Sequence, residues 1–294
     1  MTDQRSGWLK LGFVGPTLAF LIAFNLFPLC YNVGLSFTDS DLSGGQRRWV
    51  GLDNYRTVFG QERFSASLRT TGLFAAAAVA AELALGFVLA LALSGTMRGT
   101  RIVLTVLLVP MMLPAAVMGL YWYQILGGQY GILNQVLAAV GLGQPLWLND
   151  PSLKLIAILL IDIWMWTPFM MLICLAGLNA IPGHLFEAAK IDRAGRWTVF
   201  WRITLPYCAP LVGLAVLLRA TDAMKQFDLV MAVTGPNDPA TQTFSVLLYQ
   251  VMFRNQDVGQ GSAFACVVLV LVIALAILFT RYIDLLHRRR LAAA

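Results

Sequence analysis

Charged side chains are scarce in this chain. Only 12% of its 294 residues are Asp, Glu, Lys or Arg, while 59% are hydrophobic and the mean hydropathy is +0.72. A soluble domain carries about 25% charged residues, so too few polar side chains remain here to cover a surface in water. Because about 20 apolar residues in a helix span the hydrocarbon core of a bilayer, the composition predicts an all-α, polytopic membrane protein.

Cysteine and histidine are also sparse. The two histidines, His184 and His287, stand far apart, and the four cysteines lie in or beside separate apolar runs: Cys30, Cys174, Cys208 and Cys266. This spacing predicts neither a disulfide framework nor a metal site. The sequence also lacks a P-loop, a Gly-x-Ser-x-Gly elbow and a His-Glu-x-x-His motif. We therefore expect a protein that moves a solute rather than transforming it, with no catalytic residue, metal or cofactor of its own.

Long apolar runs dominate what is present. Six predicted transmembrane helices cover residues 11–37, 68–93, 102–126, 153–178, 210–233 and 262–283. The predicted organisation is a tail at 1–10, a membrane domain at 11–283 that includes a loop at 179–208, and a basic tail at 284–294. No internal repeat is visible.

The positions of Lys and Arg predict the orientation. The net charge is +6, but the basic residues stand at the ends of apolar segments and form no stripe with interleaved aromatics, so we do not expect nucleic-acid binding. Most lie in the terminal segments and in alternate loops, including Arg5, Lys10 and residues 288–290. Short basic loops stay in the cytoplasm. We predict a multi-pass protein of the plasma membrane (the inner membrane in a Gram-negative cell), with both termini and the 179–208 loop in the cytoplasm.

The 179–208 loop carries the strongest pattern. Residues at helical spacing follow Pro182: Leu185, Ala188, Ala189 and Asp192. Pro206 and Pro210 are predicted to end local helix before the fifth span. The expected structure is a short helix along the membrane face, which could pass a push from a cytoplasmic partner to spans four and five. A solvated interfacial helix with no partner fits this spacing equally well.

This stretch resembles the coupling loop of permease subunits of bacterial ABC importers. Their pattern is Glu-Ala-Ala, three residues, Gly, nine residues, then Ile-x-Leu-Pro. Here Glu187-Ala188-Ala189 is followed after three residues by Arg193, and after nine more by Ile203-Thr204-Leu205-Pro206. The spacing matches, and Arg193 replaces the glycine. The resemblance implies that a partner ATPase meets Glu187, Ala188, Ala189, Asp192 and Arg193, and the arginine leaves open how closely that partner packs.

The resemblance extends over nearly the whole chain and points to the maltose-type carbohydrate importers. Its other pieces are Phe27-Pro28, Ser36-Phe37, Gly51-Leu52-Asp53-Asn54-Tyr55, Pro110 with Pro114, Gly131 with Asn134, Phe227-Asp228 before Thr234-Gly235-Pro236, Phe244, and Asp257-Val258-Gly259. It implies the type I ABC importer permease fold, paired with a second permease, a different chain. It further implies two copies of an ATP-binding subunit, which hold ATP and Mg, and an extracytoplasmic solute-binding protein.

Six ionisable residues fall in or near the predicted spans: Glu82, Asp162, Arg219, Asp222, Lys225 and Asp228. A charged residue at a helix centre costs about 2.5–3.5 kcal/mol on insertion scales, so each should face protein or water. The last four are spaced by three and alternate in sign, which favours neighbouring pairs along one helical side. These pairs could simply neutralise each other. Glu82 is expected to hydrogen-bond to another helix.

Span four combines an acid with aromatic residues, in the run from Asp162 to Phe169, and Pro168 is expected to open the helix locally. Aromatic faces suit the C–H faces of a sugar, although lipid-facing tryptophan is an alternative. Aligned without gaps on Glu-Ala-Ala, the resemblance implies a substrate-binding role for Met111, Asp162, Trp164, Met165, Trp166, Phe169, Arg219, Asp222 and Ala223. Several of these identities, notably the charged ones, differ from the maltose-binding pattern, so maltose itself is not the expected solute.

The sequence therefore predicts the permease subunit of an ATP-driven importer for a sugar or a sugar derivative. Arg219 would suit an anionic sugar bearing phosphate, sulfonate or carboxylate, but a neutral sugar or polyol with Arg219 bound to Asp222 is the preferred version. The alternative from another class is an ion-coupled secondary transporter in which Asp162 and Asp222 relay protons. A membrane enzyme is remote, because no nucleophile–base pair stands out.

Overall fold

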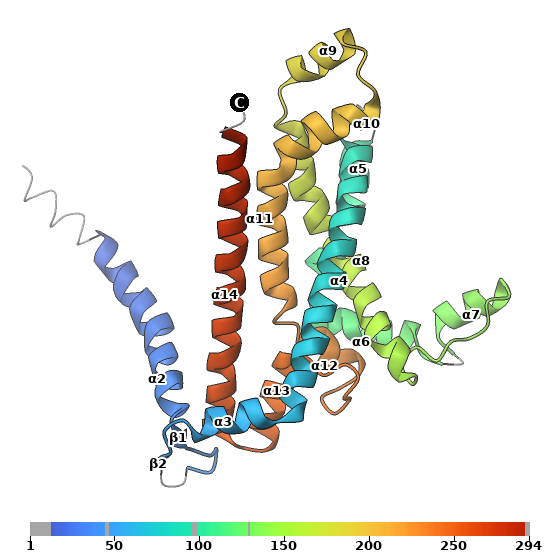
Figure 1. Ribbon diagram of the computed structural model, residues 1–294. Coiled ribbons are helices and arrows are strands. Elements are labelled where there is room, and N and C mark those ends of the chain that lie inside the picture. The colour runs from blue at the N-terminus through green and yellow to red at the C-terminus, as the bar shows by residue number, and fades with distance from the viewer. Residues whose placement is uncertain (1–12, 45–46, 96–98, 129, 292–294) are drawn as a thin grey trace, which may run out of the picture. The chain divides into compact units, whose positions relative to one another are not determined.

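The computed structural model describes residues 13–44, 47–95, 99–128 and 130–291, and the chain divides into two compact units (Figure 1). One unit combines the chain up to Phe64 with Leu248–Val270, and the other combines Ser65–Leu247 with the chain from Leu271. The predicted tail at 1–10 lies outside the described residues. Of the predicted tail at 284–294, the part up to Leu291 continues the last helix, α14 (Val258–Leu291).

Five helices among the described residues are long and apolar enough to cross a membrane: Phe13–Leu35, Glu62–Leu93, Pro151–Asn179, Arg196–Ala223 and Val258–Arg281. They correspond to five of the six predicted spans. The first contains a π-helical turn, η1 (Ile22–Leu26), followed by α2 (Phe27–Leu35). The second is α4 (Glu62–Leu93) and the third of the set is α8 (Pro151–Asn179), which stays helical through Pro168 instead of opening.

The predicted third span is present as three shorter pieces. These are α5 (Thr100–Leu108), the 3-10 turn η2 (Pro110–Met112) and α6 (Ala115–Ile125). Pro110 begins η2, and Pro114 is extended with ψ 131° immediately before α6. A proline ring removes one backbone donor and clashes with the preceding turn, so a continuous helix cannot pass both positions without breaking.

The predicted fifth span begins earlier and ends earlier than expected. It runs through α10 (Arg196–Val199), the π turn η3 (Phe200–Thr204) and α11 (Leu205–Ala223) without a break at Pro206 or Pro210. A π turn shifts the carbonyls just before Pro206, which gives room to a ring that has no N–H. After Ala223 the chain turns, and α12 (Asp228–Val233) is a separate helix. Two later hydroxyl groups donate to the carbonyls there: Ser245 Oγ to the Lys225 carbonyl (3.1 Å) and Thr243 Oγ1 to the Gln226 carbonyl (2.8 Å).

In the first unit, short elements join the pieces that carry the family resemblance. The antiparallel strands β1 (Thr38–Asp39) and β2 (Arg48–Trp49) precede α3 (Asp53–Gly60). The Asn54 amide nitrogen donates to the carbonyls of Ser36 (2.9 Å) and Thr38 (3.0 Å). The Gly259 amide donates to the Ser40 carbonyl (2.9 Å), and a Cβ at Gly259 would lie 2.1 Å from the Thr38 carbonyl oxygen, so glycine is required there. The turn η4 (Gln250–Arg254) leads towards α14.

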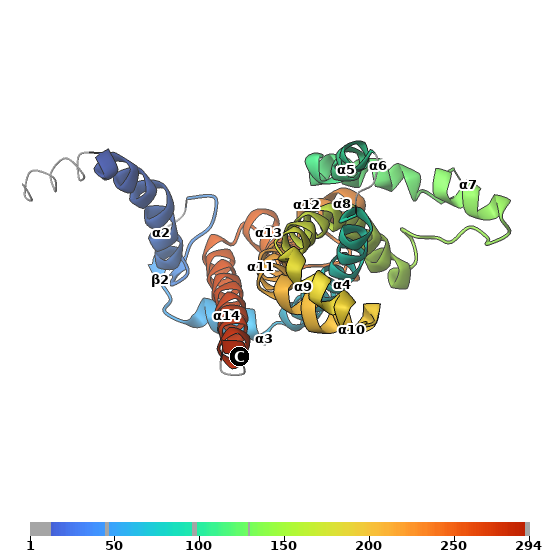
Figure 2. The same cartoon turned by 90° about the horizontal axis from the view of Figure 1, so that it is seen from above.

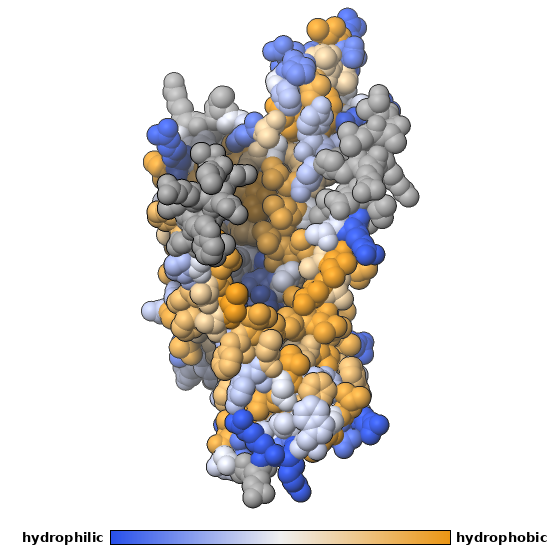
Figure 3. All heavy atoms as spheres, turned by 90° about the vertical axis from the view of Figure 1, so that its left-hand side faces the viewer, coloured by the Kyte–Doolittle hydropathy of each residue, from blue (hydrophilic) through white to orange (hydrophobic). Residues whose placement is uncertain are grey.

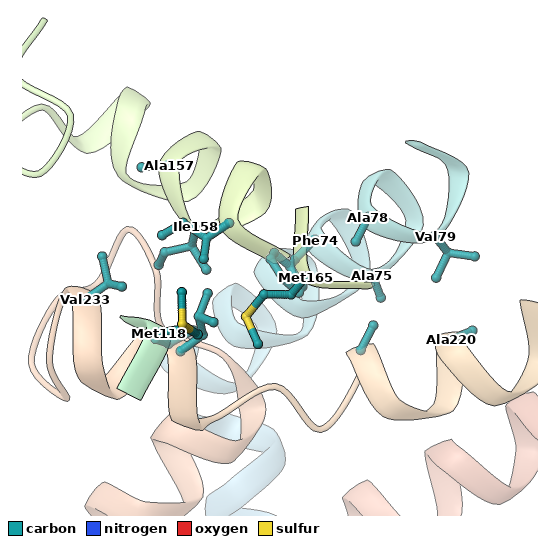
Figure 4. Close-up of a cluster of buried hydrophobic side chains, with 14 of the residues drawn as sticks. Phe74, Ala75, Ala78, Val79, Met118, Ala157, Ile158, Met165, Ala220 and Val233 are labelled. Atoms are coloured by element: carbon teal, nitrogen blue, oxygen red, sulfur yellow. The ribbon is translucent and has the colours of Figure 1, made fainter. Parts of the chain in front are cut away.

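The second unit is built around a core of buried side chains from α4, α8, α11 and α12, part of which Figure 4 shows. Two small residues bring helices together. A Cβ on Gly86 would lie 2.7 Å from Met170 Cβ, and one on Gly119 would lie 2.5 Å from Ala232 Cβ. Small residues allow close approach of membrane helices. Because Gly86 brings α4 against α8, it places Glu82, one turn earlier, beside the neighbouring spans.

Met118 of α6 and Val246 of a later helix also belong to this core. In Figures 1 and 2, α7 (Ile132–Ala139) projects away from α4, α8 and α11. The helix α13 (Phe244–Tyr249) follows the loop after α12. Many large apolar side chains are exposed, and they cover much of the face drawn in Figure 3. Exposed apolar surface of this extent suits a chain that is solvated by lipid.

Candidate functional site

Three ionisable side chains from three helices meet inside the second unit. Arg219 on α11 donates from Nε and Nη2 to the two carboxylate oxygens of Glu82 on α4, at 2.9 and 3.0 Å. Nη2 also donates to Oδ2 of Asp162 on α8. The side chains of all three residues are at most 1% exposed. This buried cluster fastens α4, α8 and α11 to one another, and its geometry is the planar fork that arginine offers to carboxylates.

Three more groups surround the guanidinium. Asp222, one turn along α11, lies 3.4 Å from Nη1, and its side chain is 53% exposed. The Gln226 amide donates to the other oxygen of Asp162, at 2.8 Å. The Trp166 ring on α8 stacks on the guanidinium, with Cζ 4.9 Å from the ring centroid. We call these six residues the Arg219 cluster: Glu82, Asp162, Trp166, Arg219, Asp222 and Gln226.

The cluster brings together four of the nine predicted substrate residues: Asp162, Trp166, Arg219 and Asp222. Glu82 was expected to hydrogen-bond to another helix, and it does so as an ion pair. Gln226 was not singled out. The sequence does contain a pattern that indicates Gln226. Arg219, Asp222 and Gln226 are polar residues at spacings of three and four in an otherwise apolar stretch, so they share one side of a helix.

The other predicted substrate residues lie elsewhere. Met165 and Ala223 are 1% and 0% exposed and belong to the apolar core (Figure 4 shows Met165). Phe169 packs edge-on against Trp166, with ring centroids 6.2 Å apart. Met111 is half-buried in η2, which packs against α8. Their role in binding stays a prediction.

Trp164 faces a different environment from Asp162. Its ring contacts Trp122 of α6 edge-on, with centroids 5.5 Å apart. It also lines an apolar groove of about 680 Å³ between α4, α5 and α8, together with Leu85, Val106 and Pro168. Positions two apart on a helix point to nearly opposite sides, which explains the separation.

The predicted coupling loop is folded as expected into a short helix. The helix α9 (Gly183–Ile191) follows Pro182 and lies beyond the end of α8 and beside α10 in Figure 1. Glu187 and Ala188 are exposed, and Ala189 is buried. Ile191 is 82% exposed on the same side, a feature that the sequence motif does not include. Glu187, Ala188 and Ile191 therefore form one exposed side of α9, and its role in docking stays a prediction.

An apolar cluster ties α9 to the spans. Buried Ile181, just before α9, belongs to a cluster with Cys174 of α8 and Cys208 of α11, and Leu185 and Phe186 of α9 pack against it. Phe87 of α4 meets Phe200 edge-on in the same cluster, with centroids 5.8 Å apart. This packing connects α9 to α4, α8 and α11.

Arg193, at the motif's glycine position, has φ 49°. Its amide donates to the Lys190 carbonyl (3.1 Å), and the Ala194 amide donates to the Ala189 carbonyl (2.9 Å). This is the Schellman pattern that ends a helix with a left-handed residue, where glycine is preferred because a Cβ is strained. The turn therefore explains why the motif has glycine here, and this chain keeps the turn with an arginine.

Comparison with known proteins agrees with these features. Residues 82–291 match the family model for the binding-protein-dependent transport system inner membrane component. A trehalose/maltose transport system permease of Thermococcus litoralis is 33% identical over 275 residues, covering 92% of this chain and 93% of that protein. A sulfoquinovosyl glycerol transport system permease of Agrobacterium fabrum is 32% identical over 286 residues, covering 94% and 92%.

The fold has solved counterparts. A chain of a bacterial ABC transporter involved in the import of the acidic polysaccharide alginate superposes with a TM-score of 0.84 at 21% identity, over 96% of this chain and 97% of that one. The same transporter has been solved with its alginate-bound periplasmic protein, and that chain gives a TM-score of 0.83. The ion-coupled alternative finds no support in these matches. The chain belongs to the family of binding-protein-dependent transport system inner membrane components: it is a multi-pass permease subunit with the type I ABC importer fold, and ATP hydrolysis takes place in a separate subunit.

Proposed function

We propose that this permease moves a sugar or a sugar derivative and that the Arg219 cluster contacts it. The observation that carries the proposal is the convergence of Asp162, Trp166, Arg219 and Asp222 from α8 and α11 between apolar spans. Carboxylates and amides bind hydroxyl groups, and an indole face packs on sugar C–H groups. The names of the similar permeases, which transport trehalose or maltose in one case and sulfoquinovosyl glycerol in another, support a carbohydrate.

Within the proposed site, the exposed and the buried residues would have different roles. Asp222 has the accessible carboxylate, and the half-buried Trp166 and Phe169 supply aromatic edges and faces beside it. Met111 of η2 would complete the wall opposite, and Met165 and Ala223 would shape the site from the core behind it. Trp164 would act through the packing of α6 against α8.

Coupling to ATP is proposed for the exposed side of α9. Glu187, Ala188 and Ile191 would dock on an ATPase subunit, and Asp192 and Arg193 would form the turn that ends the docking helix. ATP and Mg would be held by that partner. Closure of the ATPases would displace α9 and, through Ile181 and its neighbours, tilt the spans between outward and inward openings.

The proposed assembly contains a second, different permease chain, two ATP-binding subunits and an extracytoplasmic solute-binding protein. Both chain termini and α9 would lie in the cytoplasm, as the basic residues predict. Two observations support the assembly: the family model names a binding-protein-dependent system, and the alginate transporter has been solved with its periplasmic protein.

The test is purification of this chain from its native membranes in mild detergent, followed by identification of the proteins that co-elute. An ATPase and a second permease are expected. Mass spectrometry of the ligand that the cognate binding protein retains should then show a sugar or a sugar derivative. Uptake by the isolated chain in proteoliposomes, driven by a proton gradient without ATP, would refute the proposal.

A further inference from the structure

The guanidinium of Arg219 is already committed to protein partners. Nε and both hydrogens of Nη2 point at Glu82 and Asp162, and one face is covered by the Trp166 ring at 4.9 Å. The side chain is 1% exposed. The remaining nitrogen, Nη1, faces Asp222 at 3.4 Å. An anion could therefore approach this guanidinium only beside the exposed Asp222 carboxylate, or by displacing a buried carboxylate that would then lose its partner.

Carboxyl groups outnumber the guanidinium in the Arg219 cluster. One guanidinium faces the three carboxyl groups of Glu82, Asp162 and Asp222. Of the three, only Asp222 is exposed, with 53% of its side chain accessible. The charged group that a solute reaches first is therefore a carboxylate, which accepts hydrogen bonds from hydroxyls and repels phosphate, sulfonate or carboxylate.

Glu82 influences whether the Arg219 guanidinium or the Asp222 carboxylate faces the solute. Its carboxylate takes two of the guanidinium's hydrogen bonds from the far side, on α4, and its own side chain is 0% exposed. Glu82 therefore acts on a solute only through Arg219. Gly86 keeps α4 close enough to α8 for this, because a Cβ there would already lie 2.7 Å from Met170 Cβ.

We propose that Glu82 is a positioning residue for specificity: by holding Arg219 against α4 it leaves Asp222 facing the solute, so that the importer accepts neutral sugars and discriminates against anionic ones. This inference rests on the proposed function, because it concerns the charge of the sugar that the same site would bind. Of the neutral and the anionic sugars that suit the sequence, the inference selects the neutral ones.

The experiment uses the complete importer with its binding protein in proteoliposomes. Uptake is measured for one matched pair of radiolabelled probes, trehalose and trehalose 6-phosphate. The wild type should import the neutral member of the pair at least about tenfold faster, which corresponds to about 1.4 kcal/mol. Glu82→Gln should reduce this preference several-fold, because Arg219 loses one of its charged partners, whereas Glu82→Asp should retain it.

Glu62→Gln is the matched control, since it makes the same change at an exposed position of the same helix and should leave the preference unchanged. Asp162→Asn is the second variant, in case Glu82→Gln does not assemble. An unchanged preference in an assembled variant, or a wild type that prefers the anionic probe, would overturn the inference and leave the sugar-importer proposal standing. A binding protein whose retained ligand is not a sugar would instead refute the proposed function.

Discussion

Arg219 and Glu82 are separated by 137 residues in the sequence and are joined by two hydrogen bonds, at 2.9 and 3.0 Å, in the interior of the second unit. The pair connects α11 to α4, and Asp162 adds α8. A buried ion pair is weak evidence for net stability, since both groups lose their hydration. Its firmer consequence is geometric, because the pair is satisfied only when the three helices hold this arrangement.

Replacing Arg219 with Lys should destabilise the protein although the charge is kept. An ammonium group is a single centre and cannot bridge both oxygens of Glu82 while also reaching Asp162. Breaking a buried pair costs about 3–5 kcal/mol. The loss of stability should appear as a lower melting temperature in detergent. Fluorescence-detected size-exclusion chromatography of heated samples measures this temperature. Arg202→Lys, at an exposed position of η3, should melt like the wild type. Equal melting of the two variants would contradict the bridging role.

Replacing Gly86 with Ala should also destabilise the protein. The added methyl would lie 2.7 Å from Met170 Cβ and 2.8 Å from the Met171 backbone nitrogen, so α4 and α8 would have to separate. Overpacking of this kind costs about 1–3 kcal/mol. The same substitution at Gly72, on the same helix, meets no atom within 4 Å and should be neutral or slightly stabilising. The comparison of the two melting temperatures tests the contact itself, and a melting temperature for Gly86→Ala at or above that of Gly72→Ala would exclude it.

Reversing the charge of Glu187 should uncouple transport from ATP hydrolysis. The residue is exposed on α9, so Glu187→Arg should leave the permease folded. We expect solute-loaded binding protein to stimulate no ATP hydrolysis by the variant importer in nanodiscs. The control is Asp53→Arg, a similar reversal at an exposed acid of α3, which should be stimulated like the wild type. Normal stimulation of Glu187→Arg would remove this residue from the docking face.

Local patterns in the sequence predict much of this structure. Five spans and α9 follow from runs of apolar residues and from helical spacing, and Asp222 lies near Arg219 because they are one turn apart. The residues that contact Arg219 from other helices cannot be predicted in this way. Nothing in the spacing assigns Glu82 to Arg219, because that pairing depends on how α4 packs on α8, which small residues such as Gly86 control.

Other features depend on backbone chemistry that hydropathy does not record. The third predicted span has enough apolar residues to cross a bilayer, but Pro110 and Pro114 divide it. The fifth ends at Ala223, and the hydroxyl groups of Thr243 and Ser245 donate to the carbonyls of residues just beyond it. Hydropathy averaged over a window of residues detects neither effect.

The turn after α9 is a further feature that depends on backbone conformation, here at one residue. A glycine in the family motif can be read as a site of close packing, but the structure gives a local reason, since φ at Arg193 is 49°. A non-glycine residue in the left-handed region is strained by about 1–2 kcal/mol. The turn forms nevertheless, because the Arg193 and Ala194 amides both find carbonyl partners in α9.

Arg193→Gly should therefore stabilise the end of α9. Removing the Cβ strain should raise the local free energy of opening by about 1 kcal/mol, because the Schellman bonds stay in place. Amide hydrogen exchange of peptides covering residues 183–195, measured in detergent, should be slower by several-fold in the variant. Lys190→Gly is the opposing control: it lies inside the helix, where glycine is unfavourable by about 1 kcal/mol, so exchange should be faster. If Arg193→Gly instead speeds exchange, the arginine side chain contributes more to this turn than its backbone strain removes, and the glycine of the motif would need an explanation in the partner rather than in the turn.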